Sequence, residues 1–81
     1  MNEQRKDKIF NYQIIKHIAT IYEKGGFTKE LNLIKYEKAK ESKYDLRLWN
    51  TDGNTKTMRK GITLSVEEVK ALKKALNTIQ L

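Results

Sequence analysis

Apolar and polar residues alternate along the middle of the chain with the two-residue period of a β-strand. In residues 43–50, KYDLRLWN, two leucines face one side while Arg47 and Trp49 face the other. Residues 27–36 and 56–64 have a similar composition, and glycine-containing turn signals at 25–26 and 52–54 separate the segments. Residues 9–23 fit a helical stripe or a strand; their many β-branched side chains favour a long strand with a bulge near Ile14 and Ile15.

The last segment of the chain is expected to be a helix. Ser65-Val66-Glu67-Glu68 matches a capping box, so Ser65 is interpreted as a helix cap and not as a nucleophile. Apolar residues then recur at helical spacing, with lysines between them. The pattern predicts an α+β fold: a four-stranded antiparallel sheet followed by one C-terminal helix that covers one face of the sheet.

The length of 81 residues supports one domain, expected in residues 9–81 after a disordered polar leader in residues 1–8. So short a chain has only a marginal core of its own, and without cysteine it has neither disulfides nor thiolate zinc sites. His17 is the single histidine and cannot form a metal site alone. We therefore expect a homodimer without metal or other cofactor. No apolar run approaches the roughly 20 residues of a membrane span, which predicts a cytoplasmic protein with no membrane partner.

The face that the helix leaves uncovered is the candidate functional surface. Strand parity places Tyr36, Arg47, Trp49, Arg59 and Thr63 there, and the chain carries a net charge of +7. Unpaired bases stack on exposed aromatic rings for about 1–3 kcal/mol each, while basic side chains neutralise phosphates. The pattern predicts a binder of single-stranded nucleic acid in which Tyr36 and Trp49 stack bases.

Other interpretations of the same residues stay open. Trp49 fits a buried core or dimer interface equally well, and Arg47 fits a solvated charge paired with Asp45. The alternative function is a protein-interaction module on the same face, and RNA is as acceptable a target as DNA. No enzyme and no small-molecule substrate are expected, because the sequence contains no catalytic dyad, phosphate-binding loop or close carboxylate pair. For a nuclease, Asp45 is the only candidate metal ligand on the sheet face.

Three blocks of sequence resemble the bacterial branch of the positive cofactor four family of transcriptional coactivators. They are KELNLIKY from Lys29, KYDLRLW from Lys43 and KGITLSVEE from Lys60, in that order and spacing. With their connections they span Lys29 to Glu68, about half of the chain. The resemblance implies a dimer whose two sheets form one groove, and binding of single-stranded DNA with little sequence preference.

The resemblance also implies site residues. The family's third-strand Arg and Trp match Arg47 and Trp49, its second-strand aromatic matches Tyr36, and its basic residue before the GITL block matches Lys60. A looser match, based on charge and position, adds further basic residues: Lys29, Lys35, Lys38, Lys56 and Arg59. The chain departs from the family in a longer connection between Trp49 and Lys60, in Arg59 where relatives have glycine, and in its polar leader. The first two departures concern the hairpin tip, and none of the three changes the fold prediction.

Overall fold

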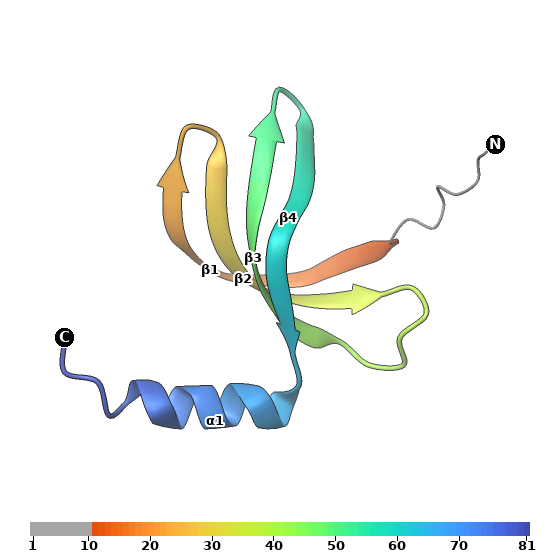
Figure 1. The fold of residues 1–81 in the computed structure, drawn as a ribbon. Coiled ribbons are helices and arrows are strands. Elements are labelled where there is room, and N and C mark those ends of the chain that lie inside the picture. Colours follow the sequence, from red (N-terminus) through yellow and green to blue (C-terminus); the bar gives the residue numbers. More distant parts are fainter. Residues whose placement is uncertain (1–10) are drawn as a thin grey trace.

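The computed structural model describes residues 11–81, which form one antiparallel sheet and one helix (Figure 1). The strands are β1 (Tyr12–Lys24), β2 (Phe27–Tyr36), β3 (Lys43–Asp52) and β4 (Thr55–Leu64), paired in chain order, and the helix is α1 (Val66–Leu76). Gly25 and Gly26 both have positive φ, as a tight two-residue hairpin turn requires. The predicted fold class is confirmed. The predicted leader in residues 1–8 lies outside the described residues, as does the start of the predicted domain at Ile9.

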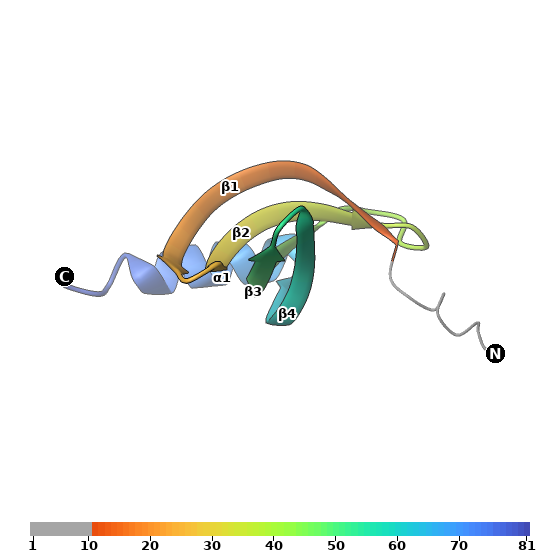
Figure 2. The same cartoon turned by 90° about the horizontal axis from the view of Figure 1, so that it is seen from above.

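β1 is strongly bent because its pairing with β2 is interrupted three times. Each interruption leaves one isoleucine of β1 without an opposite residue in β2: Ile15, Ile18 and Ile21. An inserted residue bends a strand and increases its twist, and Figure 2 shows β1 drawn into an arc. The predicted bulge near Ile14 and Ile15 is confirmed. Of the three isoleucines that fit a helical stripe in the sequence, Ile14, Ile18 and Ile21, the last two are bulge residues.

The sheet has two chemically different faces. The polar face is defined by alternate residues of the two central strands: Thr28, Glu30, Asn32, Ile34 and Tyr36 of β2, and Lys43, Asp45, Arg47 and Trp49 of β3. The apolar face is defined by the residues between them and by their neighbours on β4: Leu31, Leu33, Leu46, Leu48, Ile62 and Leu64.

The core lies on the polar face. Among residues 11–81 the buried hydrophobic side chains are Ile34 and Trp49, and the buried polar ones are Glu30, Asn32 and Asp45. All five belong to the polar face, where the curled sheet packs its own side chains together. The sequence pattern predicts the opposite arrangement, with the leucine face buried under the helix, and that prediction is wrong.

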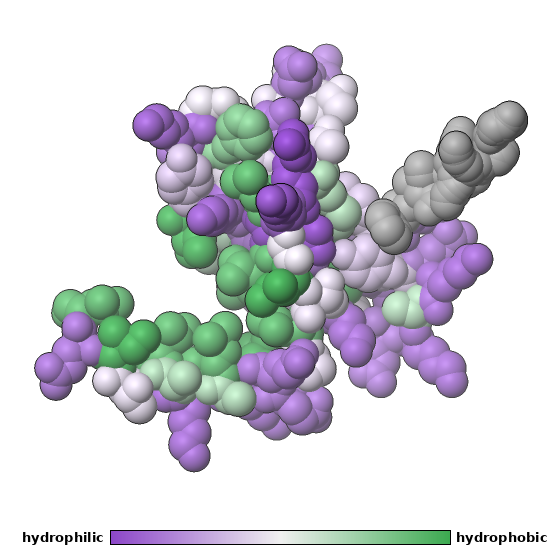
Figure 3. Space-filling model, in the orientation of Figure 1, coloured by the Kyte–Doolittle hydropathy of each residue, from purple (hydrophilic) through white to green (hydrophobic). Residues whose placement is uncertain are grey.

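The helix does not cover the sheet. Its capping box is present as predicted: the Ser65 hydroxyl accepts from the Glu68 amide, and the Glu68 carboxylate accepts from the Ser65 amide. Because Ser65 alone separates β4 from α1, the helix runs away from the sheet and has no buried residue (Figure 1). Its apolar side is separated by open space from the apolar part of the sheet (Figure 3). Across residues 11–81, no helix has the length and apolar character needed to span a bilayer.

Candidate nucleic-acid interface

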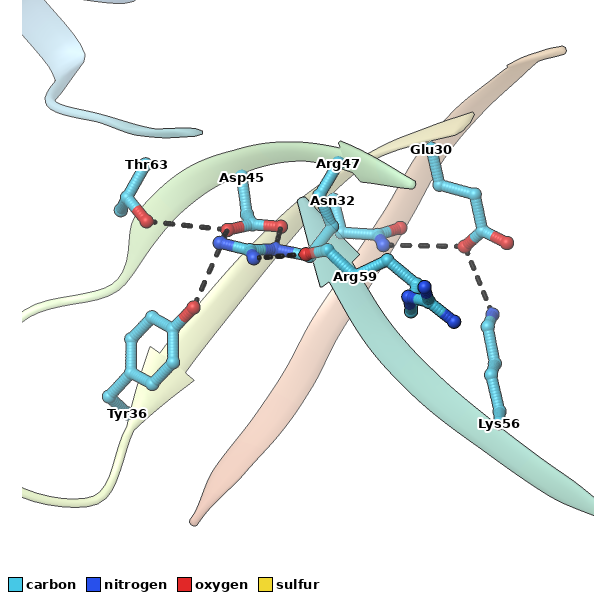
Figure 4. A network of polar contacts seen from close by, with 8 residues as sticks. All are labelled: Glu30, Asn32, Tyr36, Asp45, Arg47, Lys56, Arg59 and Thr63. Carbon is cyan, nitrogen blue, oxygen red and sulfur yellow. Dashed lines mark hydrogen bonds and ion pairs between the residues drawn. The ribbon is translucent and has the colours of Figure 1, made fainter. Parts of the chain in front are cut away.

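Asp45 organises the centre of the polar face. Its fully buried carboxylate accepts from Nε and Nη2 of Arg47, each at 2.7 Å. The hydroxyls of Tyr36 and Thr63 lie 3.4 and 3.3 Å from its Oδ2, and Nη1 of Arg47 donates to the carbonyl of Arg59 at 2.9 Å (Figure 4). A two-point ion pair fixes the plane of the guanidinium and offsets its charge. Arg47 is therefore a rigid flat surface and not a free cation, and the interpretation that pairs it with Asp45 is confirmed.

The pKa values of Arg47 and Tyr36 are both raised in this cluster. The hydrogen bonds to Asp45 are the main reason that the pKa of Arg47 is raised above its ordinary value. Burial, followed by the negative charge of Asp45, raises the pKa of the Tyr36 hydroxyl. Tyr36 therefore keeps its proton over a wider pH range and remains a hydrogen-bond donor to the carboxylate.

A hollow of about 530 Å³ opens beside this cluster. Tyr36, Arg47 and Thr63, all of which contact Asp45, form part of its wall, and the remaining lining residues are Ala39, Lys43 and Met58. Ligand pockets for small organic groups have volumes of roughly 300–1,000 Å³. The lining thus combines an aromatic residue, an arginine, a methionine and a lysine. Such a hollow suits a flat heterocycle that carries a negative group beside it.

Glu30 is a second buried carboxylate on the polar face. It accepts from Thr28 Oγ1 at 2.7 Å, from Lys56 Nζ at 3.0 Å and from Asn32 Nδ2 at 3.4 Å. Burial acts to raise the pKa of Glu30, but these three donors outweigh it and the net pKa lies below the ordinary value. His17 extends the chain of contacts, since its Nδ1 lies 2.7 Å from Asn32 Oδ1. Lys56 is thus committed to an ion pair with Glu30.

Trp49 lies on the polar face, as its parity predicts, but its exposed fraction is 0%. Its ring centroid is 5.9 Å from that of Tyr12, and the Nζ of Lys56 lies 4.9 Å from the centre of its ring. Because the sheet curls, Tyr12, which pairs with Tyr36 in the register, also reaches Trp49. The predicted exposed indole is therefore wrong for this structure, and the alternative of a buried Trp49 describes it.

Five of the predicted site residues are brought together on the polar face: Tyr36, Arg47, Trp49, Lys56 and Thr63. Arg59 lies beside them; its carbonyl accepts from Arg47, and its exposed guanidinium contacts no carboxylate within residues 11–81 (Figure 4). Tyr36, Arg47 and Thr63 contact Asp45, and Lys56 contacts Glu30. Arg59 and Trp49 contact Arg47 and Lys56, respectively. The predicted cluster exists, with two buried acids at its centre: Asp45, which the sequence pattern placed on this face, and Glu30, which was not predicted there.

The remaining predicted basic residues lie elsewhere. Lys29 and Lys60 line a hollow of about 440 Å³ together with Ile21, Leu46, Leu48 and Arg47. The Nζ of Lys35 donates to the carbonyl of Ala39 at 2.7 Å, and Lys38 is exposed in the connection between β2 and β3. None of these four lysines lines the hollow beside Asp45.

A bulge in β4 moves Arg59 out of the position on the polar face that alternation predicts. Arg47 pairs with Gly61 and Trp49 with Met58, so β4 has one more residue than β3 between these pairs. Met58 therefore takes the place on the polar face that simple alternation assigns to Arg59. Gly61 allows the close approach of the two strands, because a Cβ there would lie 2.7 Å from the Cα of Arg47.

Sequence reasoning missed several residues of the polar face. Glu30 and Asn32 have the parity of Tyr36 in the strand ELNLIKY, so alternation alone could have placed them. Alternation does not place Tyr12 on this face, because three bulges lie between Tyr12 and the turn that joins β1 to β2. Within the described part of the chain, no three His, Cys, Asp or Glu side chains gather as potential metal ligands.

Comparison with known proteins identifies the family of the chain. The family model Transcriptional Coactivator p15 (PC4) matches residues 23–75, which include β2, β3, β4 and most of α1. An uncharacterized protein of Treponema pallidum (strain Nichols) is 36% identical over 73 residues, covering 89% of this chain and 82% of that protein. No solved structure gives a significant match. With more than half of its length matched by the family model, the chain belongs to the Transcriptional Coactivator p15 (PC4) family.

Proposed function

We propose that the protein binds single-stranded DNA on its polar face, with little sequence preference, and acts in transcription or another step of DNA metabolism. The observation that supports this most directly is the hollow beside Asp45, whose wall includes Tyr36, Arg47 and Thr63. Membership of the PC4 family suggests the same ligand and a coactivator-like role. Because this ligand is found inside cells, a cytoplasmic location is part of the proposal.

In the proposed mode of binding, an unpaired base enters the hollow and lies against the ring of Tyr36 and the guanidinium plane of Arg47. Both surfaces are held in place by Asp45, so little side-chain freedom is lost when the base binds. The neighbouring phosphates would contact exposed cations at the edge, Lys43 and Arg59. Stacking and phosphate contacts read no base edge, which accounts for a weak sequence preference.

This mode of binding changes the roles of the predicted residues. Trp49 and Lys56 support the surface, because one is buried and the other is paired with Glu30. Lys35 and Lys38 flank the end of β2 and are second-line candidates for phosphate contacts. Lys29 and Lys60 lie on the apolar face and are left out of the proposed contact surface.

We also propose that the apolar face and the apolar side of α1 bind a second copy of the chain. Ile21, Ile62, Leu72 and Leu76 are between 41% and 63% exposed, although a chain of this size needs buried apolar surface to be stable. Leu72→Lys should shift the protein from dimer to monomer in analytical ultracentrifugation, whereas Lys70→Ala on the same helix should not. A wild-type chain that sediments as a monomer at micromolar concentration would contradict the dimer.

The main test is fluorescence anisotropy with labelled oligo-dT, single-stranded RNA of the same length and duplex DNA, each at two ionic strengths. The proposal expects oligo-dT to bind more tightly than duplex and the affinity to fall as salt rises. Equal affinities for duplex and single strand would contradict it, and a preference for RNA would redirect it to that ligand.

The proposal is for a binding protein and not for an enzyme. Asp45, the acid considered for a nuclease, is fully buried and engaged by Arg47 on both oxygens. Degradation of a labelled oligonucleotide in magnesium by the wild type, but not by Asp45→Ala, would contradict this part of the proposal.

A further inference from the structure

Tyr12 is the aromatic residue of the polar face that remains accessible beside Trp49. Its ring contacts two other rings, that of Trp49 at 5.9 Å and that of Tyr36 at 6.4 Å between centroids. Trp49 has an exposed fraction of 0%, whereas that of Tyr12 is 36%. A base that approaches this end of the face therefore meets the ring of Tyr12 before it meets the indole.

Tyr12 also adjoins the proposed base position in the hollow. Tyr36 lines that hollow and contacts Tyr12, so the two tyrosines form a continuous aromatic surface that leads out of it. Tyr12 lies on β1, before residue 23, where the match to the family model begins. Its place on this surface is thus a feature of this chain that the family match does not include.

We propose that Tyr12 stacks a second unpaired base, next to the base held beside Tyr36, and that it replaces Trp49 as the accessible stacking surface. This inference rests on the proposed binding of single-stranded DNA. The indole beneath Tyr12 makes the tyrosine ring a supported platform, because the ring contacts of Tyr12 with Trp49 and Tyr36 restrict its motion. A pre-positioned ring loses little conformational entropy when a base stacks on it.

The test compares the affinity of oligo-dT for Tyr12→Leu, Tyr12→Phe and the wild type by fluorescence anisotropy. Leucine keeps an apolar side chain over Trp49 but removes the ring, so Tyr12→Leu should weaken binding at least about fivefold, the lower end for one base–aromatic stack. Tyr12→Phe should bind as the wild type does. The matched control is Tyr22→Leu, a tyrosine of β1 that is 44% exposed, pairs with Lys29 on the apolar face and should have no effect.

Unchanged affinity of Tyr12→Leu would overturn the inference, and tighter binding would do so by showing that Tyr12 is a lid over Trp49. An equal loss in Tyr22→Leu or Tyr12→Phe would also overturn it, since neither change removes a ring from the polar face. If Tyr12→Leu does not fold, Tyr12→Trp serves instead: the larger ring should bind at least as tightly as tyrosine, and a fivefold loss would contradict stacking. Failure of the wild type to bind oligo-dT identifies failure of the proposed function itself.

Discussion

The ion pair between Asp45 and Arg47 gives the most direct test of the structure, through the variant Asp45→Asn. Asparagine keeps the shape of the side chain but removes the charge and replaces one acceptor oxygen with a donor, which then faces an N–H group of Arg47. Removing one partner of a buried ion pair costs about 3–5 kcal/mol. The Arg47 side chain is 15% exposed, so water reaches it in part and we expect the lower end, about 3 kcal/mol.

Thermal unfolding followed by circular dichroism measures this loss at one fixed protein concentration, because self-association would make the midpoint depend on concentration. In a domain of this size about 1 kcal/mol corresponds to a shift of roughly 4–8 °C, so Asp45→Asn should lower Tm by about 12 °C or more. The control is Asp52→Asn, an exposed aspartate at the end of β3, which should change stability by less than about 0.5 kcal/mol. A loss below about 1 kcal/mol for Asp45→Asn would refute the argument that this carboxylate holds the polar face together.

Three further predictions concern the same face. Gly61→Ala should destabilise the fold by about 1–3 kcal/mol in chemical unfolding, because its Cβ would meet the backbone of Arg47; wild-type stability would contradict the close approach of β3 and β4. The pKa of Glu30 is lower in the folded state, so its contribution to stability is present at neutral pH and is lost as the pH falls through that lowered pKa. Glu30→Gln should therefore unfold with a weaker dependence on acid pH than the wild type, and an unchanged acid dependence would contradict the assignment. Lys43→Gln should reduce the slope of log affinity for oligo-dT against log salt concentration by about 0.7. Lys56→Gln should reduce that slope less, because the ammonium of Lys56 is already paired with Glu30. Equal reductions would contradict the distinction between free and paired lysines.

Local patterns in the sequence were sufficient for the order and type of the elements. The alternation in β3, the glycine turn before β2 and the capping box at Ser65 each depend on residues close together in the chain, and each was found as predicted. Alternation also placed Arg47 and Trp49 on one face correctly. These features could be predicted because their geometry is decided within a few residues.

What alternation could not decide is which face of the sheet becomes buried. That outcome depends on the direction in which the sheet curls, and the curl follows from bulges in β1 and β4 that shift the register between strands. The bulges bring Met58 and Tyr12 to the polar face, where these side chains help to bury Trp49. The single-residue connection at Ser65 directs α1 away from the sheet, so the leucines on the other face stay partly exposed.

The count of basic residues also gave an incomplete description of the candidate site. Two of the cations on the polar face, Arg47 and Lys56, are paired with buried carboxylates at 2.7 and 3.0 Å, so the centre of the face is close to neutral. A neutral centre of fixed rings and a fixed guanidinium plane attracts bases, while free cations at its edge, such as Lys43 and Arg59, attract phosphates. In the proposed mode of binding, this division of roles requires acidic residues at the centre of the surface that contacts a polyanion. Asp45 and Glu30 fix the positions of Arg47 and Lys56. In the proposed mode of binding, the attraction for nucleic acid comes from the cations at the edge.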